Sequence, residues 1–568
     1  MYRILSSIFV LLSVTFLVVG ADFHVSLYDG LQQFRVSVPP APGQRSMTLS
    51  ASRNETVGLQ VVLFNPSDRE MSGIKVIVEN MPGITSRVDA AGAIHVYPTS
   101  NNPTSVRQFD LLRPAGRETV EAQSFRPYWI DFTVAENATP GLRKGTITFK
   151  YGGTTQSVSV QINVSHAILP VTPTLSLAFA FGRNLVEEFY GRTLTGQELF
   201  RCYDTMLAHH LSPVPMWNDA DNFYQEEVLR HCADRGMNVF FVGVSGSSTE
   251  ERQANLAIAT SRINLLRGLN LSDKIYMWSP QYDEVLFGES TKDPEVLAAR
   301  IGRMRASYEL FHETHPVFKR HATVKNPDPR LDDFVDRYII LASDIQPEYT
   351  EQDAWWYTTG QTSWRTSPDF RLDFPPMVAR YCFLALWRVG GSGYLYWATQ
   401  REWAGNKGLR ESERVEDGWQ VRYVSASNGN MVESCGAGNL FYPGGEDNIM
   451  LPSIRVKRLR DGVNDYEHLV QLRAASELLA ARQPAGWVEL LQEANALMNF
   501  SPNLIAPSQS GYLNWHDQRN AARSLLEQNK TGDFFAFRTR LVNCLDRICV
   551  AINDIGPFDN VYPGRKRQ

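Results

Sequence analysis

Short runs in which apolar and polar residues alternate dominate the chain from residue 21 to about residue 164. Such alternation is typical of strands that bury one face. Turn residues, including the pairs Pro140-Gly141 and Gly152-Gly153, separate the runs at the short spacing found in β-sandwiches. The pattern predicts an all-β sandwich over residues 21–170, with a stiff linker at 169–173. The clearest runs are residues 57–64, 128–134, 145–150 and 158–164.

After Pro173 the pattern changes to apolar runs separated by stretches with helical spacing. This alternation is typical of parallel βα units, and it predicts a (β/α)8 barrel over residues 174–470 with one strand missed or irregular. An open doubly wound sheet is the alternative. However, no Gly-x-Gly-x-x-Gly follows the first strand, so dinucleotide binding has no support. The expected strands are residues 175–181, 214–217, 238–242, 274–278, 321–324, 338–342 and 394–397.

Beyond Pro452 the apolar residues take amphipathic helical spacing, which predicts a C-terminal helical region over residues 471–568 that packs against the barrel. The last residues, 564–568, are expected to form a loose tail. The apolar positions with this spacing include Leu469, Leu472, Leu478, Leu479, Leu525, Leu526, Leu541, Leu545 and Ile548.

The N-terminal 20 residues combine Arg3, an apolar run over residues 8–19 and a small residue at Gly20, as secretory signal peptides do. We expect a cleaved signal and a secreted or lumenal protein, with a lysosome-like compartment as one destination. An uncleaved anchor is the alternative, but the run is short for a bilayer, which needs about 20 apolar residues. No later segment is long and apolar enough, so no stable membrane span is expected after cleavage.

The composition is that of an ordinary globular protein, with 568 residues of which 43% are hydrophobic and 21% charged. This length predicts roughly two to four domains. A formal net charge of -5 and the lack of a basic stripe argue against a nucleic-acid partner.

Six cysteines are too few for a disulfide scaffold at this length, although an oxidising compartment permits a few pairs. No Cys-x-x-Cys or His-Glu-x-x-His motif occurs, so we expect neither a metal nor a cofactor. Six Asn-x-Ser/Thr sites are candidate acceptors for N-glycans. These acceptors are Asn54, Asn137, Asn163, Asn270, Asn499 and Asn529.

Two consecutive carboxylates, Asp283 and Glu284, follow the expected strand at residues 274–278. In a barrel the carboxyl ends of the strands form the catalytic face. Neighbouring Cα atoms lie about 3.8 Å apart, and like charges this close push their proton affinities apart, which favours one group as a general acid. On spacing alone, an ordinary polar surface loop is the competing interpretation.

Aromatic residues are dense between residues 355 and 403. Trp and Tyr suit sugars, because sugar rings present apolar C–H faces and polar rims. Core packing is the alternative, and it is the better interpretation for Trp387, which falls on an expected helix. The other aromatic residues are Trp355, Trp356, Tyr357, Trp364, Tyr394, Tyr396, Trp397 and Trp403.

Four stretches carry a resemblance to a known enzyme family. They are Arg53-Asn-Glu-Thr-Val-Gly-Leu-Gln-Val-Val-Leu63, Pro140-Gly-Leu-Arg-Lys-Gly-Thr-Ile-Thr148, Tyr282-Asp-Glu284, and a long stretch from Trp356-Tyr357 through Asp373-Phe-Pro375, Arg380 and Gly393-Tyr-Leu-Tyr-Trp397 to Pro452-Ser-Ile-Arg455, Leu459-Arg-Asp-Gly462 and Asp465-Tyr-Glu467. Over residues 50–470 the chain resembles glycoside hydrolase family 123 and its uncharacterised relatives. The resemblance implies a β-sandwich joined to a (β/α)8 catalytic barrel that acts on β-N-acetylhexosaminides, above all N-acetylgalactosaminides.

The resemblance also implies a retaining, substrate-assisted mechanism, one of the exceptions to the two-carboxylate scheme. The 2-acetamido oxygen of the substrate attacks the anomeric carbon, so no protein nucleophile is needed. By analogy, Asp283 orients the acetamido group, and Glu284 protonates the leaving oxygen and later activates water. The expected partner is a glycan substrate, a glycoprotein or glycolipid oligosaccharide. Val285 follows the acid pair where relatives commonly have proline, which can alter the rigidity of this loop.

Further substrate-binding candidates lie in or near the matching stretches. A tyrosine hydroxyl near the acetamido oxygen is usual in such sites, and Tyr357 and Tyr396 are the two candidates, with no basis for choosing between them. Trp356 and Trp397 are expected to wall the sugar pocket. The remaining candidates are Asp373, Arg380 and Trp217.

Two other functions remain open at this point. A non-catalytic glycan-binding protein could retain the barrel and its aromatic pocket, although the presence of both acids argues against it. A glycosidase with a separated acid and nucleophile would place a second carboxylate about 5 to 5.5 Å from the first in a retaining enzyme. For the sandwich, we favour a supporting role over sugar binding. The candidates for the second carboxylate are Asp219, Asp344 and Asp373.

Overall fold

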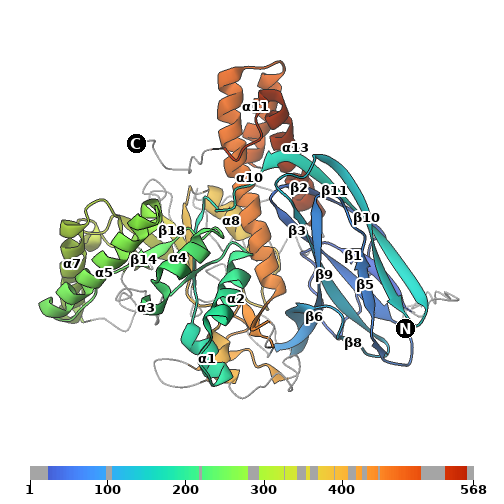
Figure 1. Ribbon diagram of the computed structural model, residues 1–568, viewed down its shortest axis with the longest axis horizontal. Helices are drawn as coiled ribbons and strands as arrows, with labels where there is room; N and C mark the ends of the chain where they lie inside the picture. Colours follow the sequence, from blue (N-terminus) through green and yellow to red (C-terminus); the bar gives the residue numbers. More distant parts are fainter. Residues whose placement is uncertain are drawn as a thin grey trace, which may run out of the picture.

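The protein folds into a β-sandwich, a barrel of parallel strands and a group of C-terminal helices, as the sequence predicts (Figure 1). The sandwich (blue to teal) and the barrel (green to yellow) lie on opposite sides of the long helix α10 (orange). The computed structural model describes residues 23–96, 105–215, 220–278, 293–324, 327–341, 354–358, 369–388, 390–406, 418–424, 431–445, 448–500 and 531–558.

Two sheets pack face to face in the sandwich. The first has the order β1-β3-β9-β6-β7, with strands His24–Tyr28, Thr56–Asn65, Ser124–Val134, Ile84–Val96 and Val106–Pro114. The second has the order β2-β11-β10-β5, with strands Ser46–Arg53, Thr154–Ile168, Gly141–Tyr151 and Lys75–Val78. A short ladder joins β4 (Met71–Ser72) to β8 (Thr119–Val120).

The hairpin of β10 and β11 shows how the sequence produces this architecture. Alternate residues such as Ile147 and Phe149 on β10 and Val160 on β11 are buried between the sheets, as strand periodicity requires. Gly152 and Gly153 form the two-residue turn, and both have positive φ (55° and 88°), which L-residues with a side chain rarely adopt. The turn therefore fixes the register of the longest ladder in the sandwich.

Eight parallel strands form the barrel in the order β13-β12-β19-β18-β17-β16-β15-β14. The first barrel strand in the chain, β12, pairs with the last, β19, so the sheet curls into a nearly closed barrel. Within the described residues, no ladder joins the two edge strands β13 and β14. In chain order the strands are Ser176–Ala180 (β12), Ser212–Val214 (β13), Phe240–Val242 (β14), Ile275–Trp278 (β15), Arg320–Val324 (β16), Arg337–Leu341 (β17), Trp355–Thr358 (β18) and Gly393–Tyr396 (β19).

The strand that the sequence analysis missed is β18. Its residues Trp355, Trp356, Tyr357 and Thr358 are all buried, so the segment has no polar alternation that would mark it as a strand. Strands of parallel sheets are covered on both faces, which removes the period of two. The crowded aromatic run is therefore a barrel wall.

Helices cover the outside of the barrel, and two of them begin with capping boxes that the sequence encodes, Thr195 with Glu198 and Ser248 with Glu251. After β19, two hairpins precede the C-terminal helices: β20 (Arg422–Val424) with β21 (Met431–Glu433), and β22 (Phe441–Pro443) with β23 (Met450–Pro452). The outer helices are α1 (Arg183–Tyr190), α2 (Gly196–Leu207), α3 (Ala220–Phe223), α4 (Glu226–Ala233), α5 (Thr249–Gly268), α7 (Pro294–Thr314) and α8 (Val378–Arg388).

The helix α10 (Ile454–Arg482) runs between the sandwich and the barrel, and its upper half in Figure 1 packs with α11 (Trp487–Met498) and α13 (Thr531–Ile552). It continues across residue 470, where the sequence analysis placed a domain boundary. At 29 residues it is about 43 Å long. Among the described residues, no helix is both long and apolar enough to cross a membrane.

Candidate active site

The acid pair predicted from sequence follows β15, which ends at Trp278. The indole Nε1 of Trp278 donates to Thr323 Oγ1 on β16 (2.9 Å), which fixes the carboxyl end of β15 in the barrel wall. Asp283, Glu284 and the substrate-binding candidate Trp217 lie outside the described residues, as do Asp219 and Asp344. Their roles remain predictions.

The direction of each β18 side chain follows from the contacts of Trp355. Its ring lies 4.8 Å from the ring of Tyr276 on β15 and 5.3 Å from His321 on β16, measured between centroids. Neither strand neighbours β18, so Trp355 points into the barrel. Successive side chains on a strand point to opposite faces. Tyr357 therefore also points inward, nearer the carboxyl end, whereas Trp356 faces the outer helices.

Tyr396 on β19 faces the opposite way from Tyr357. Its neighbour two residues earlier, Tyr394, contacts Phe383 of the outer helix α8 (ring centroids 5.7 Å apart), so this face of β19 points away from the barrel axis. The Tyr396 hydroxyl donates to Asp369 Oδ1 (3.0 Å) and accepts from the backbone N–H of Gly438 (2.9 Å). The sequence offers no basis for choosing between Tyr357 and Tyr396 as a substrate-binding residue. In the structure only Tyr357 points into the barrel.

Trp397 comes directly after β19 and is half-buried. Its ring lies against the backbone of Gly438, where a Cβ atom would come within 2.4 Å of the indole. Gly438 has φ of 68°, so both its conformation and this contact require glycine. The loop containing Gly438 thus supports one face of Trp397.

Asp369 is a buried carboxylate that sequence reasoning missed. Its Oδ1 accepts from the backbone N–H of Phe370 (2.7 Å) as well as from Tyr396, while Oδ2 is buried without a hydrogen-bond partner among the described residues. Burial raises the pKa of Asp369 to about 6, against the lowering effect of Arg371. No local motif marks this residue, because its environment is made by segments distant in sequence.

Glu402 is a second carboxylate that sequence reasoning missed, and it belongs to the 3-10 helix Arg401–Asn406 that follows β19. It accepts hydrogen bonds from the Ser434 hydroxyl, from the backbone N–H of Gly436 (3.0 Å) and from Trp419 Nε1 (2.8 Å). Burial raises its pKa to about 7. Because protein donors occupy both oxygens, Glu402 joins loops above the barrel.

Asp373 and Arg380 each form a close ion pair inside the protein. Arg371 binds Asp373 through two hydrogen bonds (2.8 and 2.9 Å). Arg380 on α8 binds Asp465 on α10 in the same bidentate manner (2.9 and 2.8 Å). The structure brings Asp373 close to Asp369 and directs the Arg380 side chain toward α10.

No group of three or more His, Cys, Asp or Glu side chains that could hold a metal ion occurs among the described residues. All six cysteines are described, and each is a buried free thiol. Cys435 lies in one of the loops above the barrel. Burial, the largest cause, raises the pKa of its thiol to about 12. A thiol with so high a pKa is a poor nucleophile.

The architecture is thus that of a β-sandwich fused to a (β/α)8 barrel, with aromatic and carboxylate side chains gathered at the carboxyl ends of the strands. Among solved structures, the chain is similar to a family 123 glycoside hydrolase from Clostridium perfringens, described as acting in glycolipid glycan hydrolysis. The two share 13% sequence identity over 91% of this chain and 99% of that chain, with a TM-score of 0.62. The fold implied by the sequence motifs is therefore confirmed.

A β-glucuronidase from Parabacteroides merdae is a more distant match, with 11% identity over 70% of this chain and 52% of that chain. Its TM-score of 0.26 is too low to support an argument. No family model matches the chain, and no curated protein matches it.

Proposed function

We propose that the protein is a glycoside hydrolase that cleaves β-N-acetylhexosaminides, N-acetylgalactosaminides first among them, by a retaining, substrate-assisted mechanism. The observation that carries the proposal is the fold shared with a family 123 glycoside hydrolase over almost the whole chain. The position of Asp283-Glu284 in the sequence, a few residues after the end of β15 at Trp278, supports it, because barrel enzymes place catalytic groups on the loops that follow the strands.

In the proposed reaction, the acetamido oxygen of the substrate bonds to the anomeric carbon while the glycosidic C–O bond breaks. Glu284 gives its proton to the leaving oxygen, and Asp283 accepts a hydrogen bond from the acetamido N–H and stabilises the developing positive charge. Water then attacks the anomeric carbon of the oxazolinium ion, the bond between this carbon and the acetamido oxygen breaks to restore the acetamido group, and a proton of the water passes to Glu284. The configuration is retained because two inversions occur.

The directions of the side chains refine the expected pocket. Tyr357, which points into the barrel, carries the hydroxyl that we assign to the acetamido oxygen, since Tyr396 points away from the barrel axis. Trp397 serves as the sugar platform. Trp356 faces the outer helices and has a packing role. Trp217, which follows β13 in the sequence, remains a candidate.

Arg380 and Asp373 are assigned to ion pairs that hold the fold together, with Asp465 and Arg371 respectively. We also propose a secreted or lumenal location on the strength of the N-terminal apolar segment at residues 8–19. The substrate is then an oligosaccharide of a glycoprotein or glycolipid in that compartment.

The test uses the purified full chain and aryl β-glycosides in the galacto and gluco configurations, each with and without the 2-acetamido group. We expect release of the aglycone only from the acetamido substrates, and inhibition by a thiazoline that mimics the oxazoline. Turnover that does not depend on the acetamido group would overturn the mechanism. Tight binding of the thiazoline with no turnover of any substrate would favour a glycan-binding protein.

Two substitutions separate the roles of the acids. Glu284→Gln is expected to lose at least about 100-fold in kcat on poor leaving groups and little on activated ones, because only the former need a proton. Asp283→Asn is expected to lose roughly 100- to 1000-fold on both, since the charge that stabilises the oxazolinium ion is gone. Full activity of Asp283→Asn would contradict the substrate-assisted assignment.

A further inference from the structure

Two loops above the barrel are held by one arginine in the first turn of α10. We call these segments, residues 369–377 and 434–440, the mouth loops: the first leads into α8 after β18, and the second connects β21 to β22 and contacts the end of β19 through the hydrogen bond from Gly438 to Tyr396. The Nη1 atom of Arg455 donates to the carbonyl oxygens of Phe370 (2.7 Å) and Gly436 (2.8 Å). One guanidinium nitrogen therefore joins the two mouth loops.

Gly436 allows this close approach. A Cβ atom at this position would lie 2.7 Å from Arg455 Nη1, and the backbone φ is 85°, in the left-handed region. The mouth loops are also joined directly, because the backbone N–H of Leu372 donates to the carbonyl of Cys435 (2.7 Å).

The charge of Arg455 is neutralised by the sandwich. Its Nε donates to Asp110 Oδ2 on β7 (3.0 Å), and both side chains are almost completely buried. The hydroxyl of Tyr442 on β22 donates to the same oxygen (2.7 Å). A buried cation without its counterion is strongly unfavourable, so Arg455 depends on Asp110 to keep its place.

A second set of sandwich contacts reaches the mouth loops without Arg455. The side-chain Nε2 atoms of Gln33 and of Gln108 on β7 both donate to the carbonyl of Leu372 (3.0 Å each). A small cavity of about 20 Å³, room for about one water, lies between these glutamines, Asp369 and Arg455. Two side chains of the sandwich thus bind the same carbonyl of the first mouth loop.

The mouth loops in turn position the aromatic side chains above the barrel. The first carries Asp369, whose Oδ1 accepts from the Tyr396 hydroxyl, and the second carries Gly438, whose N–H donates to that hydroxyl. Gly438 also lies flat against the ring of Trp397. A shift of the second loop therefore moves the support of Trp397, and a shift of the first loop acts on the second through Tyr396 and through the bond from Leu372 to Cys435.

We propose that Arg455 and Asp110 are positioning residues for the barrel site, so that the β-sandwich sets the shape of the sugar-binding mouth through them. The expected effect on KM rests on the proposed function, whereas the expected effect on the positions of the mouth loops does not. Asp110 touches no substrate, and its effect passes through Arg455 to the mouth loops and from there to Trp397.

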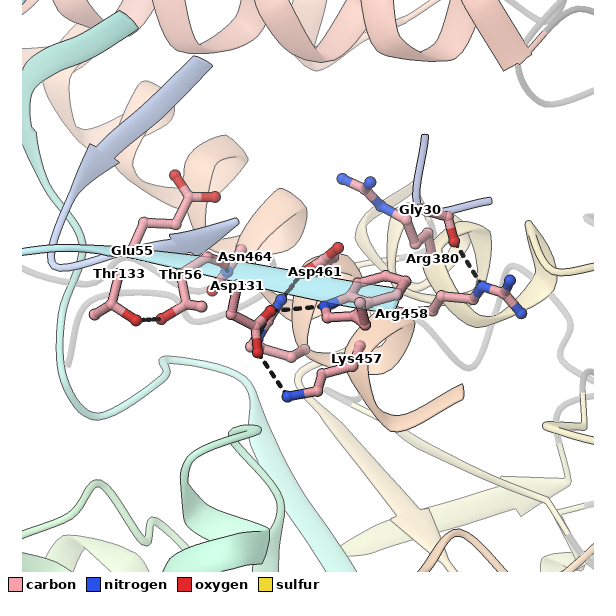
Figure 2. A network of polar contacts seen from close by, with 12 residues as sticks. Gly30, Glu55, Thr56, Asp131, Thr133, Arg380, Lys457, Arg458, Asp461 and Asn464 are labelled. Carbon is pink, nitrogen blue, oxygen red and sulfur yellow. Dashed lines mark hydrogen bonds and ion pairs between the residues drawn. The ribbon is translucent and has the colours of Figure 1, made fainter. Parts of the chain in front are cut away.

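The chain offers a matched control in Asp131 on β9. It is also a buried sandwich carboxylate that pairs with α10, accepting from Lys457 (2.6 Å) and Arg460 (2.9 Å), as Figure 2 shows in part. Among the described residues, the ion pairs of these two cations are made with Asp89, Asp131 and Asp461, none of which lies in a mouth loop. If both carboxylates only stabilise the fold, replacing either one should have the same effect on KM and on hydrogen exchange in the mouth loops.

The experiment compares Asp110→Asn with Asp131→Asn in the full-length protein. Melting temperature, kcat and KM are measured for an aryl N-acetyl-β-hexosaminide, with amide hydrogen exchange followed in peptides covering the mouth loops. We expect similar losses of melting temperature. Only Asp110→Asn is expected to raise KM at least tenfold with a smaller change in kcat, and to speed exchange in the mouth loops.

Tyr442→Phe provides a milder variant in case Asp110→Asn does not fold, because it removes one hydrogen bond to Asp110 and leaves the ring in place. It is expected to change KM in the same direction by a few fold. Equal exchange in the mouth loops and equal KM in all three variants would overturn the proposal. If the wild-type protein turns over no N-acetylhexosaminide, the proposed function fails, and the exchange comparison alone decides the positioning role.

Discussion

Glu467 on α10 is a buried carboxylate at the amino end of the barrel. Its Oε1 accepts from the backbone N–H (2.8 Å) and the hydroxyl (2.9 Å) of Thr174, just before β12, while Oε2 is buried without a hydrogen-bond partner among the described residues. Burial raises its pKa to about 7. A neutral carboxyl satisfies these two donors without the cost of a buried charge, so the folded state favours the protonated form.

This residue predicts a pH dependence of stability with a definite sign. A carboxyl whose pKa is raised by folding stabilises the folded state fully below its ordinary pKa near 4.5, and this contribution is lost as the pH rises toward 7. Glu467→Gln retains the acceptor and removes the ionisation. Relative to wild type, the variant is expected to gain about 2 to 3 kcal/mol in free energy of unfolding between pH 4.5 and 7.5.

Urea unfolding at several pH values measures this difference. Glu198→Gln is a suitable comparison, because hydrogen bonds from Arg192 lower the pKa of Glu198 to about 2 and the expected slope has the opposite sign. Identical pH profiles for wild type and Glu467→Gln would show that Glu467 is ionised in the folded protein.

At the scale of elements, α10 departs most from what its sequence suggests. Its first half carries Arg455, Lys457, Arg458 and Arg460, a pattern that usually indicates a solvated helix face, yet all four side chains are buried. Arg458 donates to the carbonyl of Gly30 (2.8 Å) in the sandwich, as Figure 2 shows. The helix is therefore buried on both sides by polar contacts with the sandwich and apolar contacts with the barrel.

The pair of Asp131 with Lys457 and Arg460 gives the element-scale prediction. Burial opposes ionisation of Asp131, but Arg460 and Lys457 outweigh it and lower the pKa of this carboxyl below its usual range. Asp131→Asn is expected to lower the free energy of unfolding by about 3 kcal/mol, near the low end for breaking a buried pair, because Arg460 keeps its contact with Asp461.

The control for this prediction is an exposed ion pair on the barrel surface, Glu226 with Arg230 on α4 (2.7 Å). Glu226→Gln is expected to change the free energy of unfolding by less than about 0.5 kcal/mol, since water screens such pairs. Denaturant titration of both variants gives the comparison. A loss of stability in Asp131→Asn as small as that in Glu226→Gln would contradict the importance of this contact.

Patterns of apolar and polar residues within a short segment predict those helices and strands whose burial follows a regular period. Alternation predicted the sandwich strands β3, β9, β10 and β11, and apolar runs predicted seven of the barrel strands, whereas β18 was missed because Trp355–Thr358 is buried on both faces. The acid pair at Asp283-Glu284 could be proposed from its place after a strand. The environment of Asp369, a loop residue, could not be predicted, because its partner Tyr396 lies on β19, 27 residues away in the sequence, and no sequence spacing encodes that contact.

At the scale of the whole molecule, buried ion pairs and hydrogen bonds join the sandwich, α10 and the barrel. The sandwich contributes Asp110 and Asp131 to cations on α10, and Glu467 on the same helix binds the start of the barrel. Removal of the sandwich would leave the cations on α10 without these carboxylate partners.

This arrangement predicts that the barrel does not fold alone. A chain starting at residue 170 lacks Asp110 and Asp131, the counterions of Arg455, Lys457 and Arg460, and leaves the sandwich-facing side of α10 bare. We expect it to be insoluble or to lack a cooperative thermal transition by circular dichroism, whereas the full chain melts cooperatively. A soluble fragment with the melting temperature of the full chain would refute this expectation.

The ion pairs between the sandwich and α10 also impose an order on biosynthesis. Asp110 and Arg455 are 345 residues apart, and Asp131 and Lys457 are 326 apart. The sandwich therefore leaves the ribosome long before its partner helix exists, and its carboxylates stay hydrated during that time at no cost. Docking of α10 then removes water from both sets of charges at once, so the sandwich and the barrel become fixed to each other only when the C-terminal part of the chain has been made.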